Sequence, residues 1–473
     1  MDSVHNKKGK RLIGNSMLFA LGDISSKLIL FLMLPFYTNI LTTDEYSISD
    51  LISTTVSLAT PFFTLVIAEA VMRFTLDKDE DRNGIFSIGL YTVIIGTVLA
   101  GIISYFAFNK ISFFKGHWSI FLLYFFTYNF YNLNSQFIKG QEKLKLLATA
   151  GIVNTLVLVA CNILFLLKMK MGINGYLLST VIAYIVSSAM LMIVGKSYKF
   201  IMPISKIKKT QLNRMLSYSI PMIPNSAMWW INNSSDRYIV TYMVSAAANG
   251  IYSVAYKIPS VFSVIMAVFM QAWQISVVED FGSKESTDFF NKVYEIFLQA
   301  VILLSAAIIS FSRFLGRILY AKEFFSAWTF SIILIIGYMF HSLAGYMGTV
   351  YTSVKKTKML FYSTAIAAVV NIVLNIALVK LFSTMGAAIA TLISYFIAFI
   401  IRRVDVKKYI KIKCNTLKYS IEIALLLFEA IIMLLNNSYS FILSIVFVAI
   451  LCIFNYSFFK QTFEMLKSLV KKH

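Results

Sequence analysis

The chain is divided into apolar runs of about 20 to 28 residues by short polar breaks, and this pattern limits its fold more than any other feature. An α-helix of roughly 20 residues, rising 1.5 Å per residue, crosses about 30 Å of hydrocarbon. Because 58% of the residues are hydrophobic and only 14% are charged, a soluble domain could not cover its surface with polar groups. The sequence therefore predicts an all-α integral membrane protein.

Fourteen transmembrane helices are expected from the runs. They are placed at 14–38, 47–72, 84–108, 118–138, 146–167, 173–194, 216–242, 249–276, 291–312, 328–352, 359–380, 384–401, 417–435 and 439–459. The basic stretch NKKGKR leads into a run of full spanning length without a small-residue cleavage site, so we expect the first helix to stay as an anchor. Cysteine usage predicts neither a disulfide framework nor a metal site, because Cys161, Cys414 and Cys452 are far apart.

The charge of +21 is explained by where the basic residues lie. With the N-terminus inside, the predicted cytoplasmic segments hold 32 Lys and Arg residues and the outer loops hold 8. This bias predicts an even number of spans with both termini in the cytoplasm. We therefore expect no nucleic-acid partner, although such a partner would also favour a basic chain.

The sequence also repeats itself. The segment KLLATAGIVNTLVLVACNILFL (145–166) aligns with KMLFYSTAIAAVVNIVLNIALV (358–379), and GYLLSTVIAYI (175–185) aligns with GAAIATLISYF (386–396). The matched pairs are Lys145 with Lys358, Asn162 with Asn375, Gly175 with Gly386, Thr180 with Thr391, and Tyr184 with Tyr395. The repeat predicts two six-helix lobes in the same orientation, 1–210 and 211–413, followed by two C-terminal helices in 414–473. Parallel repeats are one architecture of transporters, in which one half rocks against the other.

Three separated segments carry a family resemblance. They are SSDRYIVTYMVSAAANGIYSVAYKIPSV (234–261), LPFYTNILTTDEYSISDL (34–51) and GRILYAKEFFSAW (316–328). Together they resemble the polysaccharide-transport flippases of the MOP superfamily, although Ser47 stands where that family often has Gly. The resemblance implies a flippase that moves an undecaprenyl-diphosphate-linked oligosaccharide from the cytoplasmic to the outer leaflet by alternating access. The implied cargo is an O-antigen, capsule, exopolysaccharide or teichoic-acid unit, and the implied location is the cytoplasmic (inner) membrane of a bacterium.

The predicted number of helices adds to this resemblance. Fourteen spans exceed the twelve of the multidrug branch and are similar to the lipid II flippases, in which the last two helices add a groove for the lipid tail. By analogy, the two final spans are expected to serve the undecaprenyl chain. The implied partners are the lipid-linked glycan, membrane lipids and other polysaccharide-assembly proteins.

Cations within the spans are the candidate substrate-binding residues. Carrying a diphosphate across hydrocarbon requires fixed positive charge in place of water, and Lys27, Arg237 and Lys257 lie inside predicted helices. Arg and Lys side chains suit phosphate oxygens. Their spans fit the wall of a cavity between the lobes, with Arg73 expected either at the entry of the substrate or as a positive-inside anchor.

Three acidic residues could act in ion coupling or in charge pairing. Asp23 stands four residues before Lys27, Glu69 stands four before Arg73, and Asp236 adjoins Arg237, so each acid could simply neutralise its neighbour. A carboxylate in a cavity of low dielectric could instead bind H⁺ or Na⁺ and change its pairing as the cavity opens. His341 could relay protons, although a single His among aromatics is more often a packing residue. Glu422 and Glu429, seven apart, are expected on the bundle-facing side of their helix.

Other functions compete with the flippase. A multidrug or toxin exporter would use acids to hold cationic drugs, which the basic predicted spans disfavour. A polymerase or glycosyltransferase would carry a long outer loop with catalytic residues, whereas no predicted loop exceeds about 20 residues. A non-transporting scaffold for glycan assembly is the third alternative. With no nucleotide, metal or nucleophile motif present, we expect no catalytic residue, no cofactor and no chemical reaction.

Overall fold

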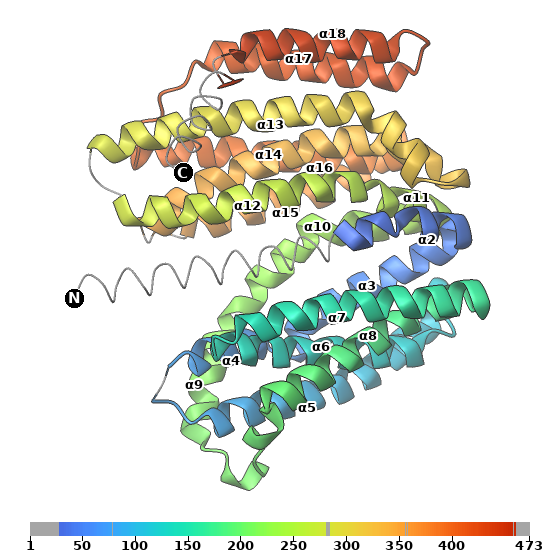
Figure 1. Cartoon of the computed structure of the whole chain (residues 1–473), viewed down its shortest axis with the longest axis vertical. Helices are drawn as coiled ribbons and strands as arrows, with labels where there is room; N and C mark the ends of the chain where they lie inside the picture. Colours follow the sequence, from blue (N-terminus) through green and yellow to red (C-terminus); the bar gives the residue numbers. More distant parts are fainter. Residues whose placement is uncertain are drawn as a thin grey trace, which may run out of the picture. The chain divides into compact units, whose positions relative to one another are not determined.

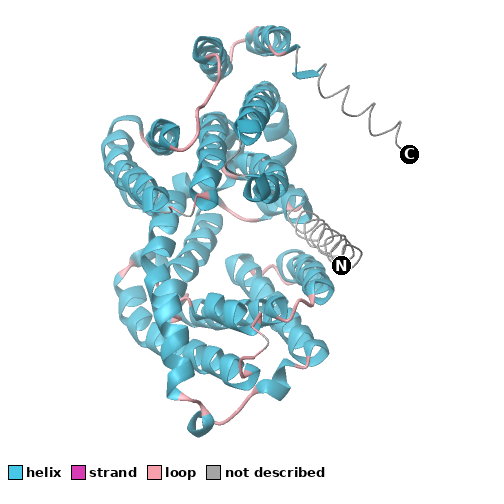
Figure 2. Ribbon diagram, turned by 90° about the vertical axis from the view of Figure 1, so that its left-hand side faces the viewer, coloured by secondary structure: helices cyan, strands magenta, loops and turns pink. Residues whose placement is uncertain are grey.

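The computed structural model of the chain describes residues 28–459 apart from Lys78, 281–283, Lys355, Thr357 and Ser457. All regular structure in these residues is helical (Figure 2). The chain forms two compact units, Met1–Ser234 and Ser235–His473. The boundary between the units lies inside a helix that the sequence prediction placed wholly in the second lobe.

Unit 1 is a bundle whose helices pack around α8 and α6. Its helices are α2 (Leu34–Ile40), α3 (Thr43–Phe63), α4 (Ile67–Thr75), α5 (Arg82–Lys110), α6 (Trp118–Gly140), α7 (Leu144–Asn162), α8 (Gly172–Gly195), α9 (Lys209–Ser219) and the first half of α10 (Ile223–Met243). Side-chain caps set several starts: the Thr42 hydroxyl accepts from the Glu45 amide at 3.2 Å, and Asp81 accepts from the Asn83 amide at 3.0 Å.

Unit 2 is built around α14, which is buried along most of its length. Its helices are the second half of α10, then α11 (Ala246–Ala255), α12 (Lys257–Asp280), α13 (Lys284–Leu319), α14 (Ala327–Ser353), α15 (Lys358–Phe382), α16 (Thr384–Asp405), α17 (Thr416–Leu435) and α18 (Ser440–Phe454). Helices α17 and α18 form an antiparallel hairpin that packs on α13 (Figure 1). The two C-terminal helices thus belong to unit 2.

Helices long and apolar enough to cross a membrane number eight among the described residues, or nine if α3 and α4 count as one broken span. Several of these helices expose apolar residues, as α5 does with Ile95, Val98, Ile102 and Phe106. A soluble protein rarely shows such faces, whereas lipid covers them at no cost. The chain is therefore a multi-pass membrane protein, and the predicted total of fourteen spans stays a prediction.

The predicted span 47–72 is bent at the junction of α3 and α4. Helices α3 and α4 meet at 64°, and the residues between them, Leu65 and Val66, have φ of 53° and 54°. A β-branched residue rarely adopts this left-handed conformation. Pro61 lies near the end of α3 and provides no amide donor, which favours a helix end here. On α5, a Cβ at Gly96 would lie 2.2 Å from the Phe63 carbonyl oxygen, so only glycine fits against the break.

The repeated segments of the sequence correspond to α7 and α8 in unit 1 and to α15 and α16 in unit 2. In both pairs the matched glycine lies close to the preceding helix: a Cβ at Gly175 would lie 3.0 Å from the Phe165 Cβ, and one at Gly386 would lie 2.1 Å from the Leu378 carbonyl oxygen. The matched tyrosines, Tyr184 and Tyr395, each join an aromatic cluster in their own unit. The repeat in sequence is thus a repeat of local packing.

Candidate functional site: a buried carboxylate among tyrosines

Asp236 lies at the start of unit 2, on α10, and only 1% of its surface is exposed. Its Oδ2 atom accepts hydrogen bonds from the Tyr252 hydroxyl at 2.7 Å, from the Tyr256 hydroxyl, and from the Thr391 hydroxyl at 3.3 Å. Its Oδ1 atom accepts from the Arg237 backbone amide at 3.0 Å. A carboxylate buried without such donors would be strongly unfavourable, so these four donors are what allow it to lie here.

The two tyrosines come from the short helix that follows α10. Tyr252 is on α11, and Tyr256 directly follows this helix, so their spacing of four residues puts both rings on one side of it. Their hydroxyls are 3.1 Å apart and both reach the same carboxylate oxygen. The sequence analysis did not identify them, although the YSVAY spacing beside an intramembrane acid was a signal that could have done so.

Arg237 directly follows Asp236 in the chain, and Lys257 directly follows Tyr256. The Arg237 guanidinium carbon lies 5.1 Å from the centre of the Tyr256 ring, which is a cation–π distance. Tyr256 therefore contacts both members of the Asp-Arg pair, since its hydroxyl binds the carboxylate and its face meets the guanidinium. Lys257 is the first residue of α12 and is half-buried.

A second layer of polar groups surrounds Thr391. The Asn371 amide donates to the Thr391 hydroxyl at 3.5 Å and to the Ser394 hydroxyl at 3.3 Å, and the Ser235 hydroxyl donates to the Asn371 side-chain oxygen at 3.4 Å. Asn375, the partner of Asn162 in the repeat, donates to the Asn371 side-chain oxygen at 3.0 Å. This network joins α10, α15 and α16 at the site, so a change at the carboxylate would be felt on all three helices.

An aromatic group continues from the same tyrosines. The Tyr338 ring centre lies 6.3 Å from that of Tyr256 and 5.9 Å from that of Tyr395, and the His341 ring centre lies 4.7 Å from that of Tyr395. His341 thus packs against aromatic rings, which is the role that a single His in such a run more often has. Flat aromatic faces also suit sugar rings.

The remaining predicted residues divide between the described and the undescribed part of the chain. Asp23 and Lys27 lie outside the described residues. Glu69 is half-buried, and its Oε1 atom accepts from the Gln136 side-chain amide at 3.1 Å. Among the residues that the structure describes, no ion pair joins Glu69 to Arg73, which is exposed in the last turn of α4. The structure thus brings Glu69 to the Gln136 side-chain amide of α6 and not to Arg73.

Arg402 is a buried charged residue that the sequence analysis missed. Only 6% of its surface is exposed, and its guanidinium donates to the hydroxyls of Ser363 and Thr364 at 2.8 and 2.9 Å and to the Ala344 carbonyl at 3.0 Å. It lies among basic residues at the end of α16 that fit the positive-inside pattern, so its sequence context indicated only an anchor. Its contacts instead join α14, α15 and α16.

Glu422 and Glu429 are fully buried on the inner face of α17, as their spacing of seven predicted. Glu429 Oε1 accepts from the hydroxyls of Ser310 on α13 at 2.9 Å and Ser444 on α18 at 2.8 Å. The ammonium group of Lys418 lies 3.7 Å from Glu422 Oε1. Glu429 thus joins the C-terminal hairpin to α13, whereas the ion-pair partner of Glu422 lies on the same helix.

Within the described part of the chain, no group of three His, Cys, Asp or Glu side chains is arranged to hold a metal ion. The polar groups at the site are instead hydroxyls, amides, one carboxylate and two cations. Such a set binds anions and hydroxyl-rich groups through hydrogen bonds and charge.

Comparison with known proteins gives the family of the chain. A family model described as polysaccharide biosynthesis protein matches residues 12–274, more than half of the chain. An uncharacterised membrane protein of Methanocaldococcus jannaschii is 26% identical over 279 residues, which make up 56% of this chain and 65% of that protein. The match thus spans slightly less than two thirds of that relative.

Solved structures give the same fold. A structure titled lipid II flippase MurJ, inward closed conformation, has a TM-score of 0.73 at 16% identity and covers 94% of this chain and 100% of its own. An inward-facing multidrug resistance MATE family transporter of the MOP superfamily has a TM-score of 0.59 at 13% identity, covering 82% of this chain and 98% of its own. A MOP superfamily transporter from Pyrococcus furiosus has a TM-score of 0.59 at 11% identity, covering 83% of this chain and 95% of its own.

The match of the family model, the sequence motifs and the fold of MOP superfamily transporters agree with one another. The chain belongs to the polysaccharide biosynthesis protein family.

Proposed function

We propose that this protein is a flippase that moves an undecaprenyl-diphosphate-linked oligosaccharide from the cytoplasmic to the outer leaflet of a bacterial plasma membrane. Membership of the polysaccharide biosynthesis family supports a role in glycan assembly. The MOP transporter fold supports movement of a cargo by alternating access. The bias of basic residues supports cytoplasmic termini.

The extent of the likeness to MurJ favours a lipid-linked cargo over a drug. The MurJ structure covers 94% of this chain, whereas the MATE structure covers 82%. The structure titled lipid II flippase MurJ thus matches more of this chain than the MATE structure does. This difference in coverage is the observation that carries the proposal.

Two cations of α10 and α12 fit the proposed cargo. In this proposal, Arg237 and Lys257 bind the diphosphate, because a guanidinium and an ammonium group replace the water that phosphate oxygens lose inside the protein. Lys27 and Arg73 are proposed to contribute on the first lobe. Tyr256 orients Arg237 by contact with its guanidinium.

Asp236 is proposed to couple transport to an H⁺ or Na⁺ gradient. As a carboxylate it accepts from two tyrosines, a threonine and a backbone amide. A bound proton would turn one oxygen from acceptor to donor, and Na⁺ would compete with the hydroxyls for the same lone pairs. Either event would rearrange contacts that reach α10, α11 and α16, which is what a coupling residue must do.

The test is transport in liposomes that contain the purified full-length chain. An undecaprenyl-diphosphate-linked sugar with a fluorescent label is followed between leaflets, with and without a proton or sodium gradient. We expect gradient-stimulated movement that falls by about tenfold or more in Arg237→Ala and in Lys257→Ala, because each removes a charge-assisted contact. Asp236→Asn should lose the stimulation by the gradient but keep gradient-free exchange.

Lys380→Ala is the matched control, since Lys380 is an exposed cation in the last turn of α15. It should transport like the unmodified protein. Absence of movement with any lipid-linked sugar, in liposomes where a known flippase is active, would contradict the proposal. A simultaneous gain in drug resistance of cells that express the chain would support the exporter instead.

A further inference from the structure

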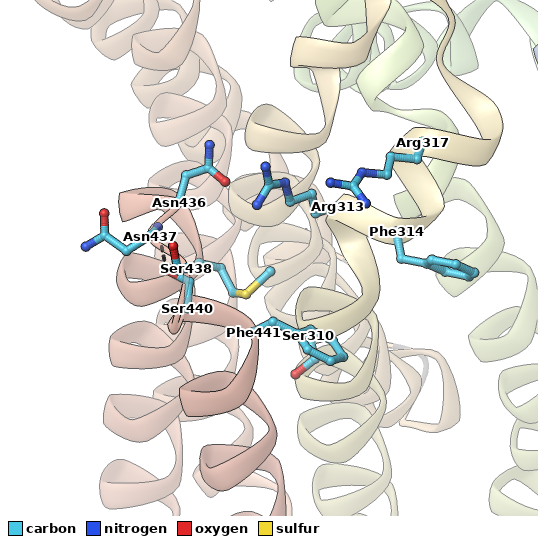
Figure 3. Close-up of a pocket in the computed structure, with 10 residues that line it drawn as sticks. Ser310, Arg313, Phe314, Arg317, Asn436, Asn437, Ser438, Ser440 and Phe441 are labelled. Carbon is cyan, nitrogen blue, oxygen red and sulfur yellow. Dashed lines mark hydrogen bonds between the residues drawn. The ribbon is translucent and has the colours of Figure 1, made fainter.

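A pocket of about 310 Å³ lies in unit 2 between the C-terminal end of α13 and the α17–α18 turn. Arg313 and Arg317 line it from α13, and Asn436, Asn437 and Ser440 line it from the turn and the start of α18. Figure 3 shows both guanidinium groups on the side of α13 that faces this turn. The volume is that of the smaller pockets that bind ligands in proteins.

The two arginines have no counter-charge in the pocket. In the part of the chain that the structure describes, neither guanidinium takes part in an ion pair or hydrogen bond, and Arg313 Nε is buried without a partner. The residues that line the pocket include no acid. A buried donor without an acceptor and two neighbouring like charges are both unfavourable, and one bound anion would relieve both.

The start of α18 contributes to the same preference. This helix begins at Ser440, and no side chain caps its first turn. The Ser440 hydroxyl accepts from the Asn437 amide at 2.9 Å, which holds the turn against the helix end. The positive end of the helix dipole therefore adds to the charge of the arginines, as at known phosphate sites.

Apolar side chains around the pocket indicate contact with lipid. Phe314 and Phe441, which both line it, are 57% and 47% exposed, and Leu435 beside it is 63% exposed. Such faces are covered by acyl chains in a membrane. A ligand here would thus combine an anionic group with an apolar tail.

Arg313 and Arg317 also differ from most other basic residues in their place in the charge pattern of the sequence. The sequence predicts this end of α13 to be on the outer side, and Arg313 and Arg317 are two of only eight basic residues expected there. The predicted span 291–312 ended before them, whereas α13 continues to Leu319 and holds both within the helix. Basic residues on the outer side run against the positive-inside bias, so topology does not explain their presence.

We propose that this pocket binds the phosphate group of a membrane lipid, with the acyl or polyprenyl chain along the exposed apolar side chains of α13 and α18. The arginines donate to the phosphate oxygens, and the asparagine and serine side chains of the turn add neutral donors. This site shares no residue with the Asp236 site. The inference does not rest on the proposed transport function.

Native mass spectrometry of the purified full-length chain tests the inference. Two pairs of lipids are compared: phosphatidylglycerol against diacylglycerol with the same acyl chains, and undecaprenyl phosphate against undecaprenol. We expect at least one phosphate lipid to be retained over its phosphate-free partner. The Arg313→Gln/Arg317→Gln variant should weaken that binding by about tenfold or more, and Arg313→Lys/Arg317→Lys should keep part of it.

The matched control is Lys380→Gln/Lys407→Gln, which removes two exposed positive charges elsewhere in unit 2 and should bind like the unmodified chain. Single Arg317→Gln, at an exposed position, serves if the double variant does not fold. Retention of phosphatidylglycerol alone would identify a phospholipid, and retention of undecaprenyl phosphate alone would identify the glycan carrier. Equal retention of phosphate and phosphate-free lipids, or binding unchanged by Arg317→Gln and by the double variant, would overturn the inference. Because this assay measures binding, its failure is distinct from a failure to transport.

Discussion

At the scale of single residues, the tyrosines around Asp236 decide what the acid can do. Asp236 and Arg237 stand out in the sequence because charged residues within apolar runs are costly. Tyr252, Tyr256 and Thr391 do not, because they reach the carboxylate from 16, 20 and 155 residues away. Whether residues so far apart in the sequence meet depends on how the helices pack, and a single sequence does not record packing.

Tyr256→Phe separates the two contacts of that ring. The change keeps the aromatic face below Arg237 and removes a hydroxyl that donates to Asp236. Loss of one donor to a buried charge should lower the free energy of unfolding by about 1–3 kcal/mol. Thermal unfolding in detergent measures this effect.

Tyr338→Phe is the control for that change, since Tyr338 packs on the same ring but its hydroxyl does not bind the carboxylate. It should leave the melting temperature nearly unchanged. Equal losses of thermal stability in both variants would show that the hydroxyl contact with Asp236 adds no stability of its own.

At the scale of elements, apolar run length predicted most helices, whereas their ends and breaks depended on backbone detail. The run 47–72 reads as one span by composition, yet its helix breaks where Leu65 and Val66 become left-handed. Pro61 lies close to this break, but the size and place of the bend also depend on the packing of α5. The contacts of Arg402 could not be predicted from the sequence either, because its partners lie on two other helices.

Gly96→Ala tests the fit of α5 against this break. The added methyl would meet backbone at 2.2 Å, and neither helix can yield by a change of side-chain rotamer. We expect unfolding to become easier by about 1–3 kcal/mol or more, as for other overpacked sites. A shift in the melting temperature of the purified chain reports it.

Gly151→Ala, in α7, provides the comparison, because nothing lies within 4 Å of the Cβ that it adds. Alanine favours a helix over glycine by about 1 kcal/mol, so this variant should melt at the same or a higher temperature. If the Gly96→Ala protein were as stable as the Gly151→Ala protein, the junction of α3 and α4 would be able to shift and accept the added methyl group.

At the scale of the whole molecule, the charge pattern and the internal repeat were the most informative parts of the sequence. The repeat anticipated that α7–α8 and α15–α16 would be equivalent, including the two close glycines. The number of spans rests on the apolar runs, and their orientation rests on the charge bias. The chain could be recognised as a member of its family from three motifs, while its candidate site needed coordinates.

Labelling of single cysteines tests the orientation. In a chain without its native cysteines, a cysteine replacing exposed Ser438 in the α17–α18 turn should react with an impermeant maleimide added to intact cells. One replacing exposed Ser205, between α8 and α9, should react only after the membrane is permeabilised, because that loop lies on the basic side. The reverse pattern would place the termini outside.

The contacts of Glu429 also bear on how the protein is made. The α17–α18 hairpin follows the other described helices in the chain, and it carries two buried acids that hydrocarbon alone would resist by a few kcal/mol each. Glu429 accepts from Ser444, which belongs to the hairpin itself, and from Ser310, which lies on α13. The hairpin is therefore stabilised in the bilayer by docking on α13, a helix that is synthesised before it.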